Sequence, residues 1–210
     1  MAKRCIIITA YLKRAVSDLY APRNGDLVLC ADGGYEHAAR AGILPDRVIG
    51  DLDSLSGIVP PEAILERVPV EKDDTDTMLC VRYALSHGCG ECLILGGIGG
   101  RLDHTLANLQ TLAFAVSNGM RAELIGDDDR VLLLKDGAMT LKREENRSLS
   151  LLSFTGRCIG VTTSGVKYPL TDATITQDNP MAVSNSFTAE EAHIAVREGM
   201  MLVVLSYIER

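Results

Sequence analysis

The sequence predicts an α/β domain with a mostly parallel sheet, followed by a smaller all-β domain that forms a sandwich or barrel. Short apolar runs alternate with helical patterns in the first half, and this alternation is typical of a parallel sheet covered by helices. After about Arg121 the helical periods end and only short β-type runs remain. We therefore place the two domains at residues 1–125 and 126–210.

In the first half, apolar runs that end in turn residues predict five strands, and apolar residues at helical spacing predict three helices. The predicted strands are Cys5–Ala10, Leu27–Ala31, Arg47–Gly50, Arg67–Val70 and Cys92–Leu95. The predicted helices are Tyr35–Ala41, Thr75–Ser86 and Asp103–Asn118. Gly88 and Gly119 follow the last two helices, where a glycine is typical of a helix end.

The second half contains short β-type runs separated by turn residues. These runs are Ala122–Ile125, Val131–Leu134, Ser148–Phe154, Cys158–Thr163, Thr174–Thr176, Glu191–Arg197 and Met201–Tyr207. Turns are predicted at Gly126–Asp129, at Lys135–Gly137 and at Glu198–Gly199. The predicted architecture is an antiparallel β domain.

The composition, with 47% hydrophobic and 23% charged residues, is that of an ordinary globular protein. A formal net charge of -7 disfavours nucleic acid as a partner, because nucleic-acid binding calls for a basic surface. No apolar stretch reaches membrane-spanning length, and the run Cys5–Ile8 is too short for a secretory signal. We therefore expect a cytoplasmic protein that does not enter a membrane.

The six cysteines are expected to be reduced thiols, as is usual inside the cell. Cys89 and Cys92 form a single Cys-x-x-Cys pair, whereas a structural zinc site needs four ligands. We therefore interpret these two cysteines as packing residues.

Acidic or glycine-rich segments follow four of the predicted strands directly. The four segments are Asp32–Gly34, Gly50–Ser54, Lys72–Asp76 and Gly96–His104. Each alone could be a helix cap or a turn. In an open parallel sheet, however, ligands bind beyond the carboxyl ends of the strands, so all four segments would share one edge. Their coincidence favours a functional site.

The residue types in these segments indicate a site for a metal ion and a polyphosphate. Asp51 and Asp53, with Asp76 from a neighbouring loop, are suited to Mg²⁺, which prefers carboxylates, water and phosphate oxygens. Lys72 and Arg101 add positive charge beside these acids. The glycines between Gly96 and Gly100 would let backbone N–H groups point at a ligand.

Several better-known motifs are missing from the sequence. The Gly96–Arg101 segment is neither a P-loop nor a Gly-x-Gly-x-x-Gly fingerprint, and no Gly-x-Ser-x-Gly elbow occurs. The four histidines show no metal-ligand spacing, and His104 is interpreted as a residue at a helix start.

Taken together, these segments resemble the thiamine pyrophosphokinase family, and the resemblance spans most of the chain in the expected order. In the first half it is carried by Ala31–Gly34, Gly50–Ser54, Lys72–Asp76 and Gly99–His104, with Ala107 and Asn108 following. In the second half it is carried by Thr163–Leu170 and Val183–Phe187. The chain departs from the family pattern at Ser186, where bacterial members often have an acid.

The resemblance implies a Rossmann-like ATP-binding domain, a thiamine-binding β domain, and a homodimer with active sites at the subunit interface. Asp51, Asp53 and Asp76 would bind magnesium, and Lys72, Arg101 and Asp103 would join them as catalytic residues. The thiamine-binding residues would be Asp103, Ser184, Asn185 and Phe187. The ATP-binding residues would be Asp32, Gly33, Gly34, Lys72, Asp73, Thr75, Gly97, Gly99, Gly100 and Arg101.

The implied reaction is the transfer of diphosphate from ATP to the hydroxyl of thiamine. Two alternatives stay open. One is a phosphatase of the haloacid-dehalogenase type with Asp51 as nucleophile, although that family places its Asp-x-Asp after the first strand. The other is a nucleotide-binding regulatory module without catalysis.

Overall fold

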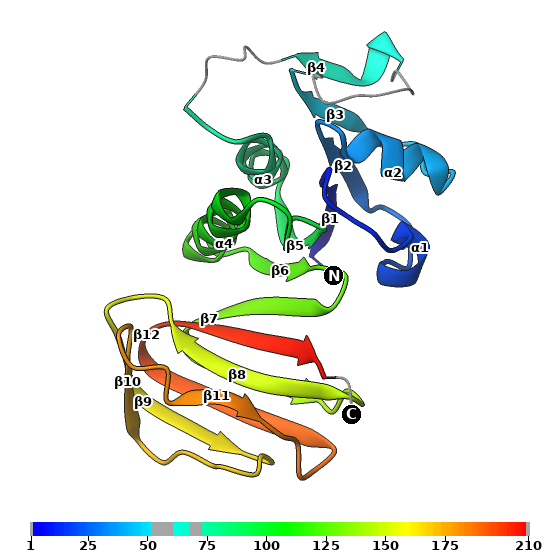
Figure 1. Ribbon diagram of the computed structural model, residues 1–210. Helices are drawn as coiled ribbons and strands as arrows, with labels where there is room; N and C mark the ends of the chain where they lie inside the picture. Colours follow the sequence, from blue (N-terminus) through cyan, green and yellow to red (C-terminus); the bar gives the residue numbers. More distant parts are fainter. Residues whose placement is uncertain (1, 52–60, 68–72, 209–210) are drawn as a thin grey trace. The chain divides into compact units, whose positions relative to one another are not determined.

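The computed structural model describes residues 2–51, 61–67 and 73–208. The chain divides into two compact units, Met1–Asp127 and Asp128–Arg210, which we call the N-terminal and the C-terminal unit. Figure 1 shows that helices occur only in the N-terminal unit, and that the described part of the C-terminal unit consists of strands and loops. The predicted fold class, an α/β domain followed by a β domain, is confirmed.

The N-terminal unit is built around a parallel sheet with the strand order β6-β5-β1-β2-β3-β4. Its strands are β1 (Lys3–Ile8), β2 (Leu27–Ala31), β3 (Arg47–Gly50), β4 (Leu65–Arg67), β5 (Cys89–Leu95) and β6 (Arg121–Ile125). Its helices are α1 (Val16–Leu19), α2 (Gly34–Arg40), the 3₁₀ turn η1 (Glu62–Ile64), α3 (Asp76–Ser86) and α4 (Leu102–Ser117).

Both faces of this sheet are covered, which explains why its strands are apolar throughout. Ile6, Ile7 and Ile8 of β1 are all fully buried although they point alternately to the two faces. In Figure 1, α1 and α2 lie on one face of the sheet and α3 and α4 on the other. Because the strands of this sheet are all parallel, their carboxyl ends lie at one edge, which is where the polar segments begin.

The C-terminal unit is an antiparallel β domain. Its strands are β7 (Asp129–Lys142), β8 (Arg147–Ser153), β9 (Arg157–Ser164), β10 (Ala173–Thr176), β11 (Ala182–Asn185) and β12 (Glu191–Tyr207). The long strand β12 pairs with β7, with β9 through its first half and with β8 through its second half. Leu149, Val161, Ile175 and Val203 come from four strands and join one buried cluster, so these strands enclose a common core.

Two of the predicted turns in the second half are wrong. Lys135–Gly137 lies inside β7 and Glu198–Gly199 lies inside β12, at a register shift between Val196 and Met200. The Gly199 N–H donates to Asp136 Oδ1 at 2.8 Å, and both residues have positive φ angles. A β-bulge uses the same residue types as a turn, which is why the pattern misled the prediction.

Other predicted elements need smaller corrections. The strand predicted at Arg67–Val70 begins earlier, as β4 at Leu65–Arg67, and residues 68–70 lie outside the described residues. The prediction also missed α1, η1 and β11, which are three or four residues long. Such short elements carry too little periodicity to be visible in a sequence.

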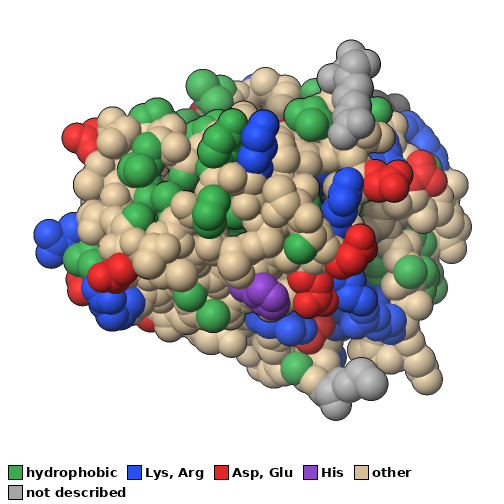
Figure 2. All heavy atoms as spheres, turned by 90° about the horizontal axis from the view of Figure 1, so that it is seen from below, with side chains coloured by type: hydrophobic (Ala, Val, Ile, Leu, Met, Phe, Trp, Pro, Cys, Tyr) green, Lys and Arg blue, Asp and Glu red, His purple; other side chains and the backbone are tan. Residues whose placement is uncertain are grey.

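None of the helices in the described part of the chain has the length and apolar character required to cross a membrane. Figure 2 shows one face of the molecule, on which acidic and basic side chains lie intermixed among polar and apolar ones.

Candidate active site

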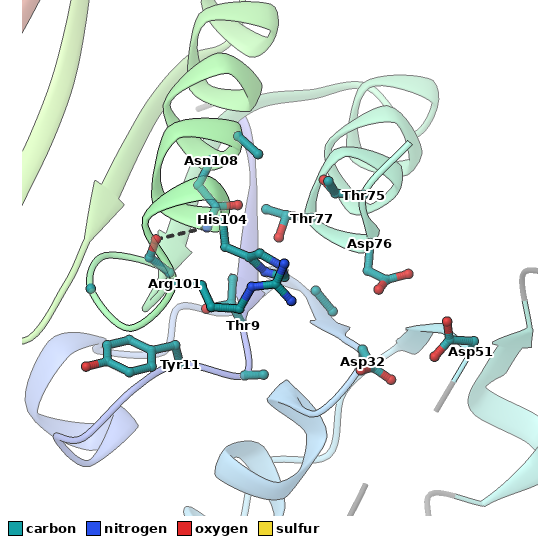
Figure 3. Close-up of a pocket in the computed structure, with 15 residues that line it drawn as sticks. Thr9, Tyr11, Asp32, Asp51, Thr75, Asp76, Thr77, Arg101, His104 and Asn108 are labelled. Atoms are coloured by element: carbon teal, nitrogen blue, oxygen red, sulfur yellow. Dashed lines mark hydrogen bonds between the residues drawn. The ribbon is translucent and has the colours of Figure 1, made fainter. Parts of the chain in front are cut away.

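A pocket of about 470 Å³ opens at the carboxyl edge of the parallel sheet. It is lined by residues that follow β1, β2, β3 and β5 and by the first turns of α3 and α4 (Figure 3). The lining residues are Thr9, Ala10, Tyr11, Ala31, Asp32, Asp51, Thr75, Asp76, Thr77, Gly97, Gly99, Arg101, His104, Ala107 and Asn108. The structure thus brings together at least one residue from each of the four polar segments seen in the sequence.

The acidic side of the pocket consists of Asp32, Asp51 and Asp76, which Figure 3 shows facing Arg101 and His104. Asp32 has a φ of 48°, a left-handed conformation that costs a non-glycine residue about 1 kcal/mol or more. Gly50 allows this conformation to pack, because a Cβ at Gly50 would lie 2.9 Å from the Cβ of Asp32. The Thr75 hydroxyl caps α3 by accepting from the Met78 N–H at 3.2 Å, which sets the direction of Asp76.

Carboxylate oxygens fit a hard cation such as Mg²⁺, and Asp51 and Asp76 line the same pocket. Within residues 2–51, 61–67 and 73–208, no three His, Cys, Asp or Glu side chains form a ready-made metal site. The third predicted ligand, Asp53, and the predicted cation Lys72 lie outside the described residues. Mg²⁺ needs only one or two protein carboxylates, so the donor set present is compatible with it.

The glycine-rich segment after β5 is held in place by the protein itself. The Gly97 N–H donates to the Tyr11 carbonyl at 2.9 Å, and the buried Asn108 amide donates to the Gly97 carbonyl at 2.9 Å. Gly97 has a φ of 76°, and a Cβ there would come within 2.4 Å of Asn108 Nδ2. The loop therefore requires glycine at this position.

This finding corrects the expected use of the glycine N–H groups. The N–H groups of Gly96, Gly97 and Gly99 donate to Ile125, Tyr11 and Thr105, respectively, and do not point at a ligand. The Tyr11 ring lies against the end of the loop, where a Cβ at Gly100 would be 2.7 Å from it. The segment thus forms part of the pocket wall, and the prediction that its N–H groups point at a ligand is wrong for Gly96, Gly97 and Gly99.

The basic side of the pocket contains Arg101, which forms a two-point ion pair with Asp103. Arg101 Nη2 donates to Asp103 Oδ2 at 2.6 Å and Nε donates to Oδ1 at 3.2 Å. Both side chains are largely exposed, at 71% and 65%. The guanidinium of Arg101, helped by the His104 N–H, holds the pKa of Asp103 below its ordinary value. Asp103 is therefore a weak base and a stable hydrogen-bond acceptor.

Some predicted site residues do not line the pocket. Asp73, Asp103, Gly33, Gly34 and Gly100 lie near it in the chain but are not part of its wall. Gly34 has a packing role, since a Cβ there would lie 2.0 Å from the Ile8 carbonyl oxygen and push α2 away from β1.

The sequence did not assign Thr9, Tyr11 or Thr77 to the site. It gave Asn108 only as part of the family motif and His104 only as a helix-start residue, although all five line the pocket. Thr9 and Tyr11 follow β1 in the same way that the acidic segments follow the other strands. Extending the strand-end rule to uncharged polar residues would have found both of them.

Three of the four predicted thiamine contacts lie on β11 and just after it, in the C-terminal unit, whereas Asp103 lies on α4 in the N-terminal unit. Asn185 Oδ1 accepts from the N–H groups of Tyr168 and Ser186, and Asn185 Nδ2 donates to the Tyr168 carbonyl at 2.8 Å. Phe187 is partly buried against the core cluster of this unit and forms a bridge with Val166. Ser184 is exposed and has a φ of 59°. Asn185 and Phe187 thus support the fold here, whereas the Ser184 side chain faces solvent.

Comparison with protein families gives two matches along the chain. Residues 21–124 match the family model described as thiamin pyrophosphokinase, catalytic domain. Residues 138–201 match the model described as thiamin pyrophosphokinase, vitamin B1 binding domain. The two matches fall in different structural units.

Individual relatives agree with the family matches. The chain is 29% identical to thiamine pyrophosphokinase from Bacillus subtilis, with 83% of this chain and 85% of the relative covered. It is 25% identical to thiamine pyrophosphokinase 1 from Oryza sativa, with 80% and 74% covered. The fold is similar to the crystal structure of the Bacillus subtilis enzyme, at a TM-score of 0.89 and 24% identity, covering 99% of this chain and 100% of that chain.

Proposed function

Because the chain belongs to the thiamine pyrophosphokinase family, we propose that it transfers the diphosphate of ATP to the hydroxyl of thiamine, giving thiamine diphosphate and AMP. The observation that carries the proposal is the ordered match of the catalytic and the vitamin B1 binding models to the two units. The phosphatase alternative finds no support, because Asp51 follows β3 and not the first strand. A non-catalytic module is equally unsupported.

ATP is assigned to the pocket of the N-terminal unit. Its volume of about 470 Å³ lies within the usual range for small-molecule sites. Arg101 and His104 face the acids across the pocket, so cationic and anionic groups are available on opposite sides (Figure 3). Such an arrangement suits a polyphosphate with a bound cation.

Magnesium is assigned to Asp51, Asp53 and Asp76. When bound, it would neutralise charge on the phosphate oxygens and orient them. Asp51 directly follows β3 and Asp76 begins α3, so both carboxylates lie at the ends of regular elements.

The remaining chemistry belongs to the side chains of the chain itself. The thiamine oxygen forms a bond to the β-phosphorus, and the bond from that phosphorus to the bridging oxygen of AMP breaks. Arg101 and Lys72 stabilise the negative charge that develops on the transferred group. Asp103, whose pKa is lowered by Arg101, accepts a hydrogen bond from the thiamine hydroxyl and orients it, and the hydroxyl proton passes to solvent.

We assign thiamine to Ser184, Asn185 and Phe187 together with Asp103, and we propose a cytoplasmic homodimer in which two subunits share each site. Exposed apolar side chains support a second copy as the partner. Leu102 and Leu106 are 72% and 52% exposed beside Arg101, and Tyr168 and Val183 are 63% and 47% exposed near Ser184.

The proposal is tested by incubating the purified protein with ATP, magnesium and thiamine and separating the products by chromatography. Thiamine diphosphate and AMP in equal amounts are expected. Thiamine monophosphate with ADP would contradict attack at the β-phosphorus, and a folded protein without thiamine-dependent ATP consumption would contradict the function.

A further inference from the structure

The segment that follows β1, residues 9–14, contributes Ala10 and Tyr11 to the pocket wall. Two neighbouring elements hold the first part of this segment. His37 on α2 donates from Nε2 to the Ala10 carbonyl at 2.9 Å, and the Gly97 N–H donates to the Tyr11 carbonyl at 2.9 Å. Both bonds act on carbonyl groups at the pocket, so the chain beyond Tyr11 is fixed by other contacts.

The Asp127 carboxylate holds the second part of the segment. Its Oδ1 accepts hydrogen bonds from the Lys13 N–H at 3.0 Å and from the Arg14 N–H at 2.8 Å. Oδ2 accepts a longer bond from the same Lys13 N–H at 3.3 Å, and Arg14 Nη1 donates in return to the Asp127 carbonyl. One side chain thus fixes two backbone N–H groups, although Lys13 and Asp127 are 114 residues apart in the chain.

The sheet order explains why this contact matters for the pocket. Asp127 follows β6, and β5 lies between β6 and β1 in the parallel sheet. The contact from Asp127 to Lys13 and Arg14 therefore links the chain beyond β6 to the chain beyond β1 at the edge where the glycine-rich segment leaves β5.

The Tyr11 side chain connects the held segment to the basic side of the pocket. Lys13 Nζ lies 5.9 Å from the centroid of the Tyr11 ring, within the range of a cation–π contact. The same ring lies so close to the glycine-rich segment that an added Cβ would be 2.8 Å from it at Gly99 and 2.7 Å at Gly100. Arg101 follows directly and lines the pocket (Figure 3). Fixing the Lys13 backbone therefore supports Tyr11, and through Tyr11 the segment that carries Arg101.

The next residue, Asp128, offers an internal contrast. Asp128 is exposed, and its backbone carbonyl accepts from the Tyr207 N–H at 3.0 Å. Asp127 and Asp128 carry the same charge side by side, but the carboxylate of Asp127 bonds to the segment after β1. Neither residue lines the pocket.

We propose that Asp127 is a positioning residue that holds residues 10–14 in the ATP-binding conformation before ATP arrives. This inference rests on the proposed assignment of ATP to the pocket. The carboxylate touches no substrate and takes part in no bond-breaking step. A wall that has the binding conformation only part of the time lowers the apparent affinity by that fraction. At saturating ATP the nucleotide itself selects this conformation, so turnover is maintained.

Asp127→Ala tests this role, with Asp127→Asn and Asp128→Ala as matched controls. Asparagine loses the charge but keeps an oxygen that can accept from the Lys13 and Arg14 N–H groups. The Kd for ATP with magnesium is measured by calorimetry without thiamine. The KM for ATP and kcat are measured at saturating thiamine, and the thermal midpoint is recorded for each protein.

The expected result is a change in ATP affinity without a change in turnover. If Asp127→Ala has the binding conformation about a tenth of the time, its Kd and KM for ATP should rise about 10-fold, with kcat within about 2-fold of the wild type. Asp127→Asn and Asp128→Ala should bind ATP within about 3-fold of the wild type, because both keep the acceptor at position 127. A direct effect of charge would instead tighten ATP binding in all three variants, since each loses a negative charge.

The role of Asp127 is overturned if folded Asp127→Ala binds ATP as tightly as the wild type does. It is also overturned if this variant loses kcat at unchanged KM, which is the result that partial loss of active protein would give. In both cases the proposed function stands. A folded wild-type protein that does not bind ATP would instead contradict the proposed function, and the inference with it.

Hydrogen exchange in the wild-type protein keeps the proposal testable if Asp127→Ala does not fold. The Lys13 and Arg14 amides should be protected from exchange before any nucleotide is added, because their N–H groups are already bonded to Asp127. Exchange of both amides at the rate of an unprotected chain, followed by NMR without ATP, would overturn the proposal.

Discussion

The pocket of the N-terminal unit and the β11 segment of the C-terminal unit use polar side chains in different ways. Asp51 and Asp76 line an open pocket at the ends of regular elements. The Asn185 amide, by contrast, makes three hydrogen bonds to the backbone of Tyr168 and Ser186. Both sets of residues stand out in the sequence, yet Asp51 and Asp76 line a cavity whereas the Asn185 side chain bonds to the backbone.

The difference shows that a residue in a sequence motif can act by fixing the conformation of the backbone around it. A loop that must present a ligand surface needs a fixed conformation, and a local side-chain to backbone hydrogen bond provides it. Substitutions should therefore separate the two regions: replacement of a pocket carboxylate should reduce turnover without loss of stability, whereas replacement of Asn185 should reduce stability as well.

The largest effect is expected from Asp76→Ala. Removal of a carboxylate that we propose to hold magnesium should lower kcat about 100-fold or more, because charge stabilisation by a metal contributes several kcal/mol. The thermal midpoint should change little. Turnover and thermal denaturation measured on the same preparation check both statements.

Asp74→Asn is the matched control for Asp76→Ala. Asp74 lies two residues away, pairs with Arg82 at 2.7 Å and is not part of the pocket wall. It should keep nearly full activity. Equal losses in the two variants would contradict the assignment of Asp76 to the metal.

A smaller loss of activity is expected from Arg101→Lys. Lysine cannot reproduce the two-point contact of a guanidinium, so kcat should fall about 10-fold to 100-fold. Arg40→Lys is the control, because Arg40 is an exposed arginine that pairs with Glu36 on α2 outside the pocket. A fully active Arg101→Lys enzyme would remove Arg101 from the mechanism.

The ion pair between Arg101 and Asp103 predicts how the ionisation of Asp103 and kcat depend on pH. Arg101 lowers the pKa of Asp103, so Asp103 stays ionised at neutral and mildly acidic pH and should produce no step in kcat there. Arg101→Gln should let this pKa rise toward its ordinary value. Titration of the Asp103 carboxyl by NMR in both proteins would show the upward shift, and a downward shift would contradict the pairing.

Gly97→Ala should disrupt the part of the pocket wall that the glycine-rich segment after β5 forms. The positive φ and the contact with Asn108 together should destabilise the protein by about 2–4 kcal/mol. Gly88→Ala measures the stability cost of the backbone conformation alone. Gly88 also has a positive φ, but nothing lies within 4 Å of an added Cβ. It should cost only about 1 kcal/mol. Chemical denaturation of both variants gives the difference, and equal costs would contradict the close contact.

The smallest effect, and the sharpest contrast between regions, is expected from Asn185→Ala beside Ser184→Ala. Asn185→Ala removes three hydrogen bonds and should destabilise the protein by about 1–3 kcal/mol. Ser184→Ala should raise the KM for thiamine and leave stability nearly unchanged. If Ser184→Ala changed stability alone, its assignment to thiamine would be wrong.

Much of the fold could be predicted because its signals are local. Apolar runs locate β2 and β3 and helical spacing locates α3 and α4, and glycines follow both of these helices. The bulges at Asp136 and at Gly199 could not be told from turns, since both features need residues that tolerate positive φ. Only the pairing with the partner strand shows that the strand continues through each of these two positions.

The position of the candidate site could be predicted from the sequence, but the contacts within it could not. The strand-end rule brought acids from four segments to one edge, and the structure places Asp32, Asp51 and Asp76 there. It could not show that Gly97 donates to Tyr11, because that contact joins segments far apart in the chain.

The most direct test of the account is the fate of the α-phosphate of ATP in a single turnover with thiamine and magnesium. With ATP labelled at the α-phosphate, the wild-type protein should release the label as AMP, and Asp76→Ala should release almost none in the same time. Label appearing in ADP would mean stepwise transfer of single phosphates. That result would contradict diphosphate transfer by the pocket of the N-terminal unit.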